Sequence, residues 1–448
     1  MDFIPELRRV AHQQKRNITK PEDTVDFAQW GEITVGDLAG QMAGIARDYG
    51  LNDLAATTPL YALESQGFSA LTAAEIPACV SSGTCNRSEL FLGLPRSHPT
   101  FPTSHSPAYS NAAFQILAYA LEKITNSNFA SLLSDAIIKP LNLSKSSILP
   151  PDAQYGVIPG TEASSYWSFP LGEEAPAGGF YSSANDLSTV SRSILSNTLL
   201  SPAVTRRWLK PISHTSSLDF AVGQPWEIFS FQEGRTIDLF TKMGNIIAYG
   251  AAMALSPDHN AGFSVLVAGP NPALASDTLT RLSDLLSTNL IRALEGAAKD
   301  EAQKFTGTYV NTAPNTNSSI ALAIDSGPGI SVTSWINDGV NVLQTVQVFY
   351  QIPTLADVSV RLYYTALDHQ VESGSTFISF RAVMRSLADT NTPTAFQGPI
   401  GNSCHSWQLV DGVIYGNVGL DEFLFEVNED GQVISIQPRA LRVTLTKQ

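Results

Sequence analysis

The sequence predicts an α+β fold in which helices and an antiparallel sheet are followed by an all-β C-terminal domain. Residues 112–124 repeat apolar side chains at steps of three and four, which is typical of a helix with one face on a core. Two apolar runs, 246–257 and 262–269, flank a Pro-Asp-His-Asn turn and predict a hairpin. After about Phe305, short alternating segments separated by Gly, Asn, Asp and Pro predict antiparallel strands.

Composition bounds the class of protein. The chain has 448 residues, of which 43% are hydrophobic and 15% charged, as expected for a folded globule with a sizeable core. Its net charge of -14 argues against a nucleic-acid partner, because phosphate binding needs a basic face. No apolar run approaches the roughly 20 residues of a membrane helix. We expect a small-molecule substrate or ligand, no nucleic acid and no membrane, and the oligomeric state stays open.

The N-terminus and the cysteines bear on the compartment. Residues 1–17 contain no apolar signal-peptide core, so the chain as written is expected to be cytoplasmic. If the true start lies upstream, secretion is the alternative. Cys79 and Cys85 lie in a polar loop and can form a small disulfide in an oxidising compartment, whereas Cys404 would be left over. The sequence does not decide whether that disulfide forms.

Neither a metal nor an organic cofactor is expected. The three cysteines and seven histidines show none of the spacings of a zinc site. Neither a dinucleotide-binding nor a phosphate-loop glycine pattern is present.

The segment from Pro107 to Asn111 predicts a loop-to-helix corner. Ser110 and Asn111 are short polar residues of the kind that caps a helix start. Pro107 disfavours a helical conformation just before the corner. Tyr109 is therefore expected to have a fixed ring and a hydroxyl free to face a cleft. The alternative is purely structural, with Tyr109 as a half-buried aromatic residue and Asn111 as a cap.

Flanking patterns place the other helices of this part. Phe114, Leu117, Leu121 and Ile124 are expected to form the buried face of the helix that follows the corner. Residues 48–106 are rich in Gly, Pro, Ser and Thr and predict a long irregular excursion. Residues 276–298 predict a long amphipathic helix with a leucine stripe.

Two further segments are candidates for the site: a pair of glycines in a turn, and a lysine at the start of an apolar strand. Gly178 and Gly179 form a turn that allows close backbone approach, and Ser182 or Ser183 then caps a helix. Lys242, followed by Met243 and Gly244, is expected at the start of the apolar strand 246–257. It is either a surface residue at the strand edge or a cation that points into a site.

The change of texture near residues 300–305 sets the domain boundary. We expect one domain over residues 1–303 and a β-rich C-terminal domain over residues 304–448. No internal repeat is present.

Together, these ordered segments resemble the serine β-lactamase and penicillin-binding-protein family, in its class C-like, esterase-like branch. PAYSNAAFQILAYALEKIT is similar to the family's Y-x-N helix, PAGGFYSSANDLS to its G-G turn, and TKMGNIIAYGAAMALSP to its K-T-G strand. ITVGDLAGQMAGI resembles the segment after its nucleophile helix. Residues 305–448 resemble the C-terminal domain of a fungal group of these proteins, and CNRSELF and SGPGISVTSWINDG are similar to that group's own sequences.

The resemblance implies an antiparallel sheet flanked by helices beside a helical region, with the site between them. It implies acyl transfer through the serine of an S-x-x-K motif, with backbone N–H groups holding the oxyanion. Tyr109 and Lys242 would be catalytic, the tyrosine as general base or its partner. Because a tyrosine with an ordinary pKa near 10 is a poor base at neutral pH, nearby cations must favour its phenolate. Asn111, Met243 and Gly244 would bind substrate.

The chain departs from this pattern in two places. No serine stands three residues before any lysine, so the nucleophile serine is absent from the sequence. The match begins after the family's first strands and nucleophile helix, which are therefore expected to be missing from residues 1–303. Met243 also stands where the family has Thr or Ser, and so lacks a hydroxyl that would contact a substrate carboxylate.

Three hypotheses follow. The first is a serine hydrolase or acyltransferase whose written start is too late, acting on an ester, thioester or amide of a small, secondary metabolite rather than on a β-lactam. The second is an inactive member, a pseudoenzyme, that binds a small molecule or a protein partner through the retained cleft. The third is a damaged chain that barely folds, because missing edge strands expose apolar surface.

Overall fold

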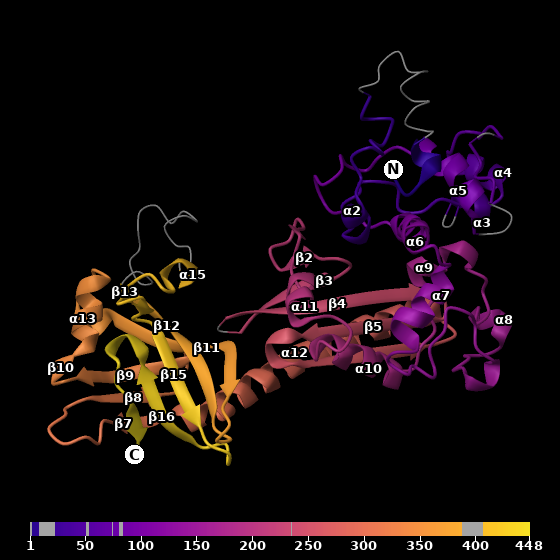
Figure 1. Ribbon diagram of the computed structural model, residues 1–448. Helices are drawn as coiled ribbons and strands as arrows, with labels where there is room; N and C mark the ends of the chain where they lie inside the picture. The colour runs from indigo at the N-terminus through magenta and orange to yellow at the C-terminus, as the bar shows by residue number, and fades with distance from the viewer. Residues whose placement is uncertain are drawn as a thin grey trace. The chain divides into compact units, whose positions relative to one another are not determined.

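The structure is a computed structural model that describes residues 2–8, 23–50, 53–73, 75–79, 84–233, 235–387 and 406–448. The chain divides into two compact units, Met1–Leu290 and Ile291–Gln448, and the division falls inside the long helix α12 (Figure 1). The predicted α+β class is confirmed, since the first unit combines helices with an antiparallel sheet and the second is mostly strands.

Short helices dominate the first unit, and most begin at a polar capping residue. Thr34, Asn86, Ser110 and Ser183 each accept a backbone N–H at a helix start, as short polar side chains do. The helices are α2 Val35–Ala39, α3 Leu54–Thr57, α4 Leu60–Ser65, α5 Arg87–Gly93, α6 Asn111–Thr125, α7 Phe129–Leu133, α8 Glu162–Ser165, α9 Ala175–Gly178, α10 Ala184–Leu195 and α11 Pro202–Trp208.

The excursion between residues 48 and 106 is more ordered than its composition predicts. Helix α5 buries Leu90 and Phe91 in the same core as Ile116 of α6. A disulfide joins Cys79 to Cys85 immediately before α5, with Cα atoms 5.1 Å apart. The expectation of a wholly irregular segment was therefore wrong, because the capping box at Asn86 starts a helix in a stretch with little periodicity.

Six antiparallel strands form the sheet of the first unit, and their order in space follows their order in the chain. They are β1 Ser213–His214, β2 Phe220–Val222, β3 Glu227–Gln232, β4 Thr236–Ile246, β5 Tyr249–Ser256 and β6 Ala261–Ala268. Helix α12, Pro272–Ala302, contains the predicted leucine helix and packs Leu279 against Ala252 and Val265. Ile194 and Leu195 of α10 pack against a second cluster that includes Phe240 and Leu255.

Two local predictions need correction. Lys242 lies within β4, not at the start of the next strand, because a turn at Ile247 separates β4 from β5. Ile247 has φ of 49°, a left-handed conformation that a β-branched residue rarely adopts. The buried face of α6 consists of Ala112, Ala113, Gln115, Ile116, Ala118, Tyr119 and Ala120, rather than the face that carries Phe114 and Ile124. Small alanines allow close packing there, and Gln115 donates to the Tyr119 hydroxyl at 3.0 Å.

The second unit is built on a nine-stranded antiparallel sheet that closes on itself through a pairing between β8 and β9. Its strands are β7 Gly307–Val310, β8 Ser319–Ala323, β9 Ile330–Asn337, β10 Val340–Asn341, β11 Val358–Gln370, β12 Thr376–Ser386, β15 Glu422–Val427, β16 Val433–Pro438 and β17 Leu445–Lys447. A separate pair, β13 Ile414–Tyr415 and β14 Val418–Gly419, and the helices α13 Val342–Phe349 and α15 Ser406–Leu409 complete the unit.

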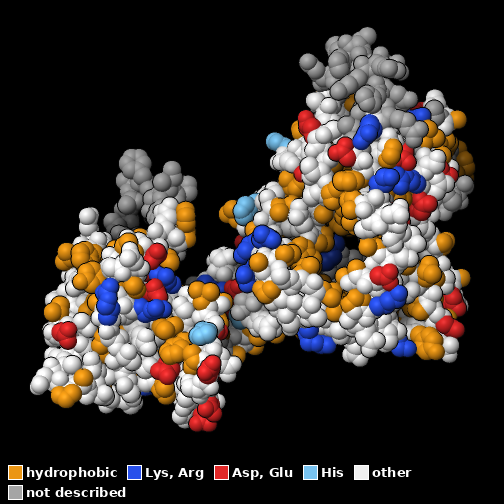
Figure 2. All heavy atoms as spheres, in the orientation of Figure 1, with side chains coloured by type: hydrophobic (Ala, Val, Ile, Leu, Met, Phe, Trp, Pro, Cys, Tyr) orange, Lys and Arg blue, Asp and Glu red, His pale blue; other side chains and the backbone are white. Residues whose placement is uncertain are grey.

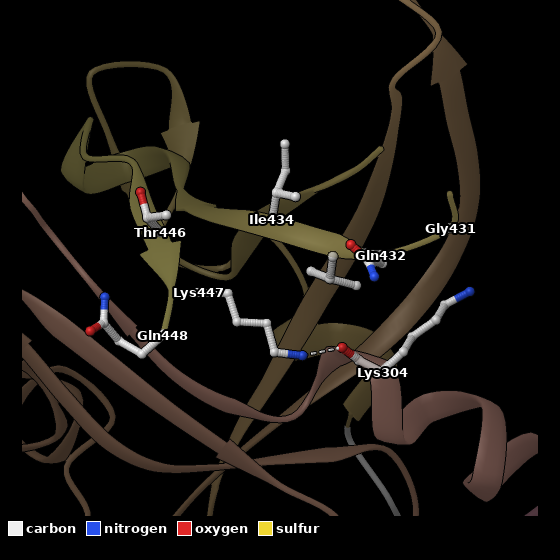
Figure 3. Close-up of a pocket in the computed structure, with 8 residues that line it drawn as sticks. Lys304, Gly431, Gln432, Ile434, Thr446, Lys447 and Gln448 are labelled. Atoms are coloured by element: carbon white, nitrogen blue, oxygen red, sulfur yellow. Dashed lines mark hydrogen bonds between the residues drawn. The ribbon is translucent and has the colours of Figure 1, made fainter. Parts of the chain in front are cut away.

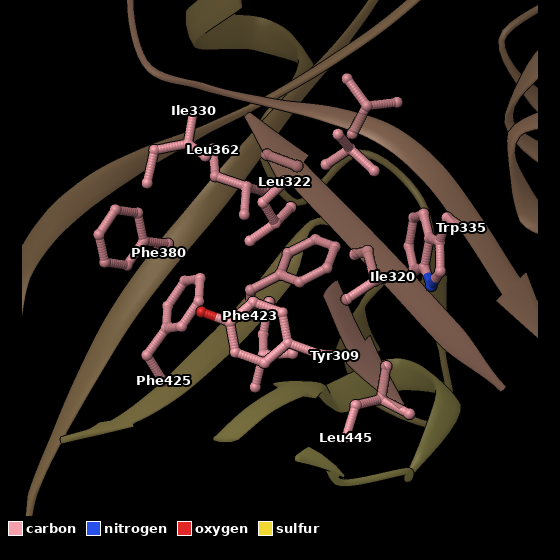
Figure 4. Close-up of a cluster of buried hydrophobic side chains, with 14 of the residues drawn as sticks. Tyr309, Ile320, Leu322, Ile330, Trp335, Leu362, Phe380, Phe423, Phe425 and Leu445 are labelled. Atoms are coloured by element: carbon pink, nitrogen blue, oxygen red, sulfur yellow. The ribbon is translucent and has the colours of Figure 1, made fainter. Parts of the chain in front are cut away.

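Aromatic side chains fill the interior of this closed sheet. Tyr309, Phe423 and Phe425 are fully buried, and the Phe425 ring lies 4.9 Å from Phe305 and 5.0 Å from Phe380, centre to centre (Figure 4). Strand alternation explains this arrangement, because every second residue of β15 points inward. The unit therefore has its own hydrophobic core.

The face of the molecule drawn in Figure 2 carries both kinds of charge. On the face drawn in Figure 2, acidic and basic side chains of the described residues are interspersed, with hydrophobic side chains scattered between them. Within the described parts of the chain, every helix is too short or too polar to cross a membrane.

Candidate functional site

Tyr109 is held at the entry to α6 by bonds on both sides of the corner. Ser110 caps the helix, accepting the Ala113 N–H at 3.0 Å, and its own N–H donates to Gln41 Oε1 at 2.6 Å. The Ser110 hydroxyl donates to the Ala46 carbonyl at 2.8 Å. Ser110 is buried, whereas Tyr109 keeps 39% of its surface exposed. The corner predicted from sequence is therefore present, and Tyr109 lies at its surface.

Lys242 reaches the same tyrosine from the sheet. Its ammonium lies 5.3 Å from the centre of the Tyr109 ring, so β4 and the start of α6 meet at this point (Figure 1). Arg47 supplies a second cation, with its guanidinium carbon 4.8 Å from the same ring centre. Cations at such distances from an aromatic face are attracted by its quadrupole. The structure thus brings Tyr109 and Lys242 together and adds Arg47, which the sequence analysis did not single out.

Glu227, the first residue of β3, holds Lys242 in place. Its Oε1 accepts from Lys242 Nζ at 2.7 Å, and its Oε2 accepts from the Met243 N–H at 3.2 Å. Its backbone carbonyl accepts from the Thr241 hydroxyl at 2.7 Å. The β3–β4 backbone pairing ends at Glu227 and Thr241. Beyond this point the Glu227 carboxylate, rather than its backbone, bonds to β4. Both oxygens of Glu227 are engaged with the segment that carries the candidate lysine.

Asn111 is turned toward the segment before α3. Its side-chain amide donates to Asp48 Oδ1 at 2.8 Å, and Asp48 Oδ2 lies 3.5 Å from Arg47 Nε. The Asp48 side chain is only 9% exposed. In this structure one amide hydrogen of Asn111 is therefore bonded to Asp48, and the side-chain oxygen of Asn111 takes no part in that hydrogen bond. Asp48, like Arg47, was not predicted from the sequence.

Met243 and Gly244 lie next to Lys242 but differ in exposure. The Met243 side chain packs against the cluster of Ala252, Val265 and Leu279, on the face of β4 opposite to Lys242. Gly244 has nothing within 4 Å of the position where a Cβ would stand. Gly178, in the turn predicted to allow close approach, faces Ile246, with Cδ1 3.7 Å from its Cβ position. Gly244 thus leaves open space beside Lys242, whereas Met243 contributes its backbone alone.

A buried acid lies close to this group. Glu174 is 8% exposed, and among the described residues its Oε2 has no hydrogen-bond partner. Burial, with a smaller contribution from the Asp48 charge, raises the pKa of Glu174 to about 7 against the lowering effect of the Cys85 N–H. A carboxyl group with such a pKa exchanges its proton near neutral pH.

The residues missed by sequence reasoning are charged residues inside otherwise apolar or small-residue segments. Glu227 interrupts the apolar run around Trp226 and Ile228, and Arg47 and Asp48 follow the run that ends at Ala46. A charge in a strand that is otherwise buried is a usable signal, because it needs a partner. The identity of that partner depends on tertiary contacts and not on local pattern.

A hollow of about 490 Å³ lies in the C-terminal unit beside β16 and β17 (Figure 3). Lys447 Nζ donates to the Lys304 carbonyl at 2.5 Å on its floor, and burial lowers the pKa of Lys447. Its lining is mostly backbone and aliphatic, formed by Lys304, Gly431, Gln432, Val433, Ile434, Thr446, Lys447 and Gln448. Among the described residues, no carboxylate side chain lines it.

The mixed helical and antiparallel fold of the first unit, with Lys242 beside Tyr109, is that of a β-lactamase-like protein. The chain belongs to the β-lactamase family: the family model described as "Beta-lactamase" matches residues 10–286. A second model, described as "Beta-lactamase-like-like, C-terminal domain", matches residues 297–448. The resemblance stated from the sequence is thereby confirmed for both parts of the chain.

Similar proteins include two from fungi. A "Beta-lactamase-like protein" of Arthroderma benhamiae is 29% identical over 96% of this chain and 75% of its own length. A "Probable hydrolase M10" of a Phoma species is 24% identical over 96% of this chain and 73% of its own length. Among solved structures, a β-lactamase/D-alanine carboxypeptidase from Yersinia pestis is 19% identical, with a TM-score of 0.42 over 63% of this chain and 81% of that one.

Proposed function

We propose that the site around Tyr109 and Lys242 recognises the acyl group of a small ester, thioester or amide, in the manner of an acyl-transfer hydrolase. The observation that carries the proposal is the approach of the Lys242 ammonium to within 5.3 Å of the Tyr109 ring centre. A lysine in the sheet and a tyrosine at a helix corner meet beside the open space at Gly244.

The chemistry follows from charge around one tyrosine. When the Tyr109 phenolate accepts a proton from a reacting group and later returns it, the negative charge on its oxygen is lost and then restored. Lys242 and Arg47 stabilise that charge, because both cations lie next to the ring. Asn111 lies two residues from Tyr109 and has an amide oxygen that can accept a hydrogen bond from a ligand amide. These residues account for recognition and proton transfer, and we assign no covalent step to them.

A second candidate is a binding site without hydrolysis. Two observations favour it: no serine stands three residues before a lysine, and Glu227 already engages Lys242. Such a protein would hold a small ester or amide, or the end of a protein partner, without cleaving it. Under this alternative the same residues contact the ligand.

One experiment separates the two candidates. The 448-residue chain is assayed for hydrolysis of p-nitrophenyl acetate and, by calorimetry, for binding of N-phenylacetylglycine methyl ester. Tyr109→Phe and Lys242→Ala are compared with Lys139→Ala, which removes an exposed lysine paired with Asp135.

Hydrolysis that falls at least tenfold in both site variants and persists in Lys139→Ala supports the enzyme. Ester binding without hydrolysis, weakened in Lys242→Ala, supports the binding protein. If the ester does not bind, or if the site variants bind and hydrolyse as well as the parent, the proposed function is wrong.

A further inference from the structure

We infer that Glu227 makes this site select acyl ligands that carry no carboxylate, an inference that rests on the proposed function. The structural basis is a single carboxylate that engages both the charge of Lys242 and the backbone N–H of Met243. These are the two groups on this strand that would attract an anionic substituent.

Lys242 has little donor capacity left. An ammonium group has three N–H donors. One bonds Glu227 Oε1 at 2.7 Å, and another bonds the Met243 carbonyl at 2.6 Å. A ligand carboxylate can therefore reach Lys242 only by displacing Glu227 or by sharing the remaining donor next to an existing negative charge.

The position of Glu227 is fixed on several sides. Its backbone pairs with Thr241 in the ladder, and its carbonyl accepts the Thr241 hydroxyl. Its carboxylate has two bonds to the neighbouring segment, and one quarter of the side chain is exposed. Displacing the carboxylate would break both of these bonds, so it already occupies the position that an anion would take.

The second cation of the site is also paired. Arg47 Nε lies 3.5 Å from Asp48 Oδ2, although most of the Arg47 side chain is exposed. Two cations thus each face a carboxylate around Tyr109, and the formal charges of these four side chains sum to zero. A site of zero net charge with a fixed carboxylate repels an anion at short range and accepts a neutral acyl group.

Met243 adds no polar group to this position. Its side chain packs against Ala252, Val265 and Leu279 on the other face of β4. Because its N–H is used by Glu227, an incoming carboxylate finds neither a hydroxyl nor a free amide at residue 243.

The test uses two probes that differ only in charge, N-phenylacetylglycine and its methyl ester, with binding to the 448-residue chain measured by calorimetry. The parent protein should bind the methyl ester at least tenfold more tightly than the acid. Glu227→Gln keeps the shape of the side chain and removes its charge, and should raise the affinity for the acid relative to that for the ester about tenfold.

Two controls accompany this variant. Asp135→Asn removes a carboxylate from an exposed lysine pair elsewhere and should change neither affinity. The double variant Glu227→Gln with Lys242→Gln removes both charges and should return the acid to its weak binding. If Glu227→Gln does not fold, the salt dependence of the parent decides: acid binding at a charge-balanced site should not weaken between low and high salt.

The outcomes separate this inference from the proposed function. Equal affinity of the parent for acid and ester, unchanged preference in Glu227→Gln, or acid binding that weakens steeply with salt each overturns the role of Glu227. If neither probe binds the parent or the variants, the proposed function fails, and this inference fails with it. Ester binding that is lost in Lys242→Ala, with a preference for ester over acid that Glu227→Gln leaves unchanged, leaves the proposed function standing and rejects the selectivity.

Discussion

The Lys242 ammonium lies 5.3 Å from the centre of the Tyr109 ring, which ties the sheet of the first unit to the start of helix α6. This contact should be measurable as a coupling free energy. Cation–ring contacts at partly exposed sites contribute about 0.5–1 kcal/mol.

A double-mutant cycle isolates this contribution. Tyr109→Leu and Lys242→Gln, singly and together, should give a coupling of about 0.5–1 kcal/mol in the free energy of unfolding measured by denaturant titration. A cycle of Tyr109→Leu with Lys139→Gln is the control, because Lys139 pairs with Asp135 and not with Tyr109. Equal couplings in both cycles would mean that the ring does not hold the lysine.

Glu174 should make stability depend on pH. Burial raises its folded-state pKa to about 7 from an ordinary value of 4.5. Between these values the folded protein keeps a proton that the unfolded chain has lost. Its contribution is therefore fully present below pH 4.5 and is lost as pH rises through 7, a change of about 3 kcal/mol.

Glu174→Gln keeps the shape of the group and removes this titration. The variant should be more stable than the parent at pH 8, by about 2–3 kcal/mol, and should approach the parent at pH 4.5. Urea unfolding at both pH values measures the difference, and Glu64→Gln, an exposed acid on α4, serves as the control. A constant difference across this pH range would show that Glu174 does not titrate there.

Local chemistry explains which parts of the fold were predictable from sequence. The start of α6 was predicted because Ser110 caps it with its own side chain. The hairpin of β5 and β6 was predicted because its strands are apolar and a turn at Pro257–His259 separates them. The β4–β5 turn was missed because Ile247, which adopts a left-handed conformation there, is not one of the residue types that are usual in turns.

In the site, too, only the residues that belong to a local motif were predictable from sequence. Tyr109 and Lys242 follow recognisable motifs, and the structure places them together. Glu227 and Asp48 follow no motif, and their importance comes from partners that only the folded chain brings near. The alanine-rich face of α6 was misassigned because periodicity ranks large apolar residues above the small residues that allow close packing.

The C-terminal unit should depend strongly on Phe425. This ring is fully buried and contacts the rings of Phe305 and Phe380. Phe425→Ala should lower the free energy of unfolding of this unit by about 3–5 kcal/mol, because it leaves a cavity. Phe349→Ala, at a residue that is 60% exposed, should change it by less than about 0.5 kcal/mol. Hydrogen exchange in β15 and β12 reports the effect, and similar losses in both variants would contradict the packing described here.

Gly50 should tolerate no side chain, because it lies against the disulfide. Its φ is 84°, and a Cβ there would stand 2.6 Å from Cys79 Sγ and 2.8 Å from Cys85 Sγ. Gly67 has a similar φ of 96° but nothing within 4 Å of its Cβ position. Gly67→Ala therefore measures the backbone cost alone, about 1–2 kcal/mol, whereas Gly50→Ala should cost about 1–3 kcal/mol more because the methyl group overpacks the sulphurs. Thermal unfolding of both variants gives the comparison. Equal losses would mean that the segment before α3 does not rest on Cys79 and Cys85, and the disulfide would then have no part in positioning the adjacent Asp48.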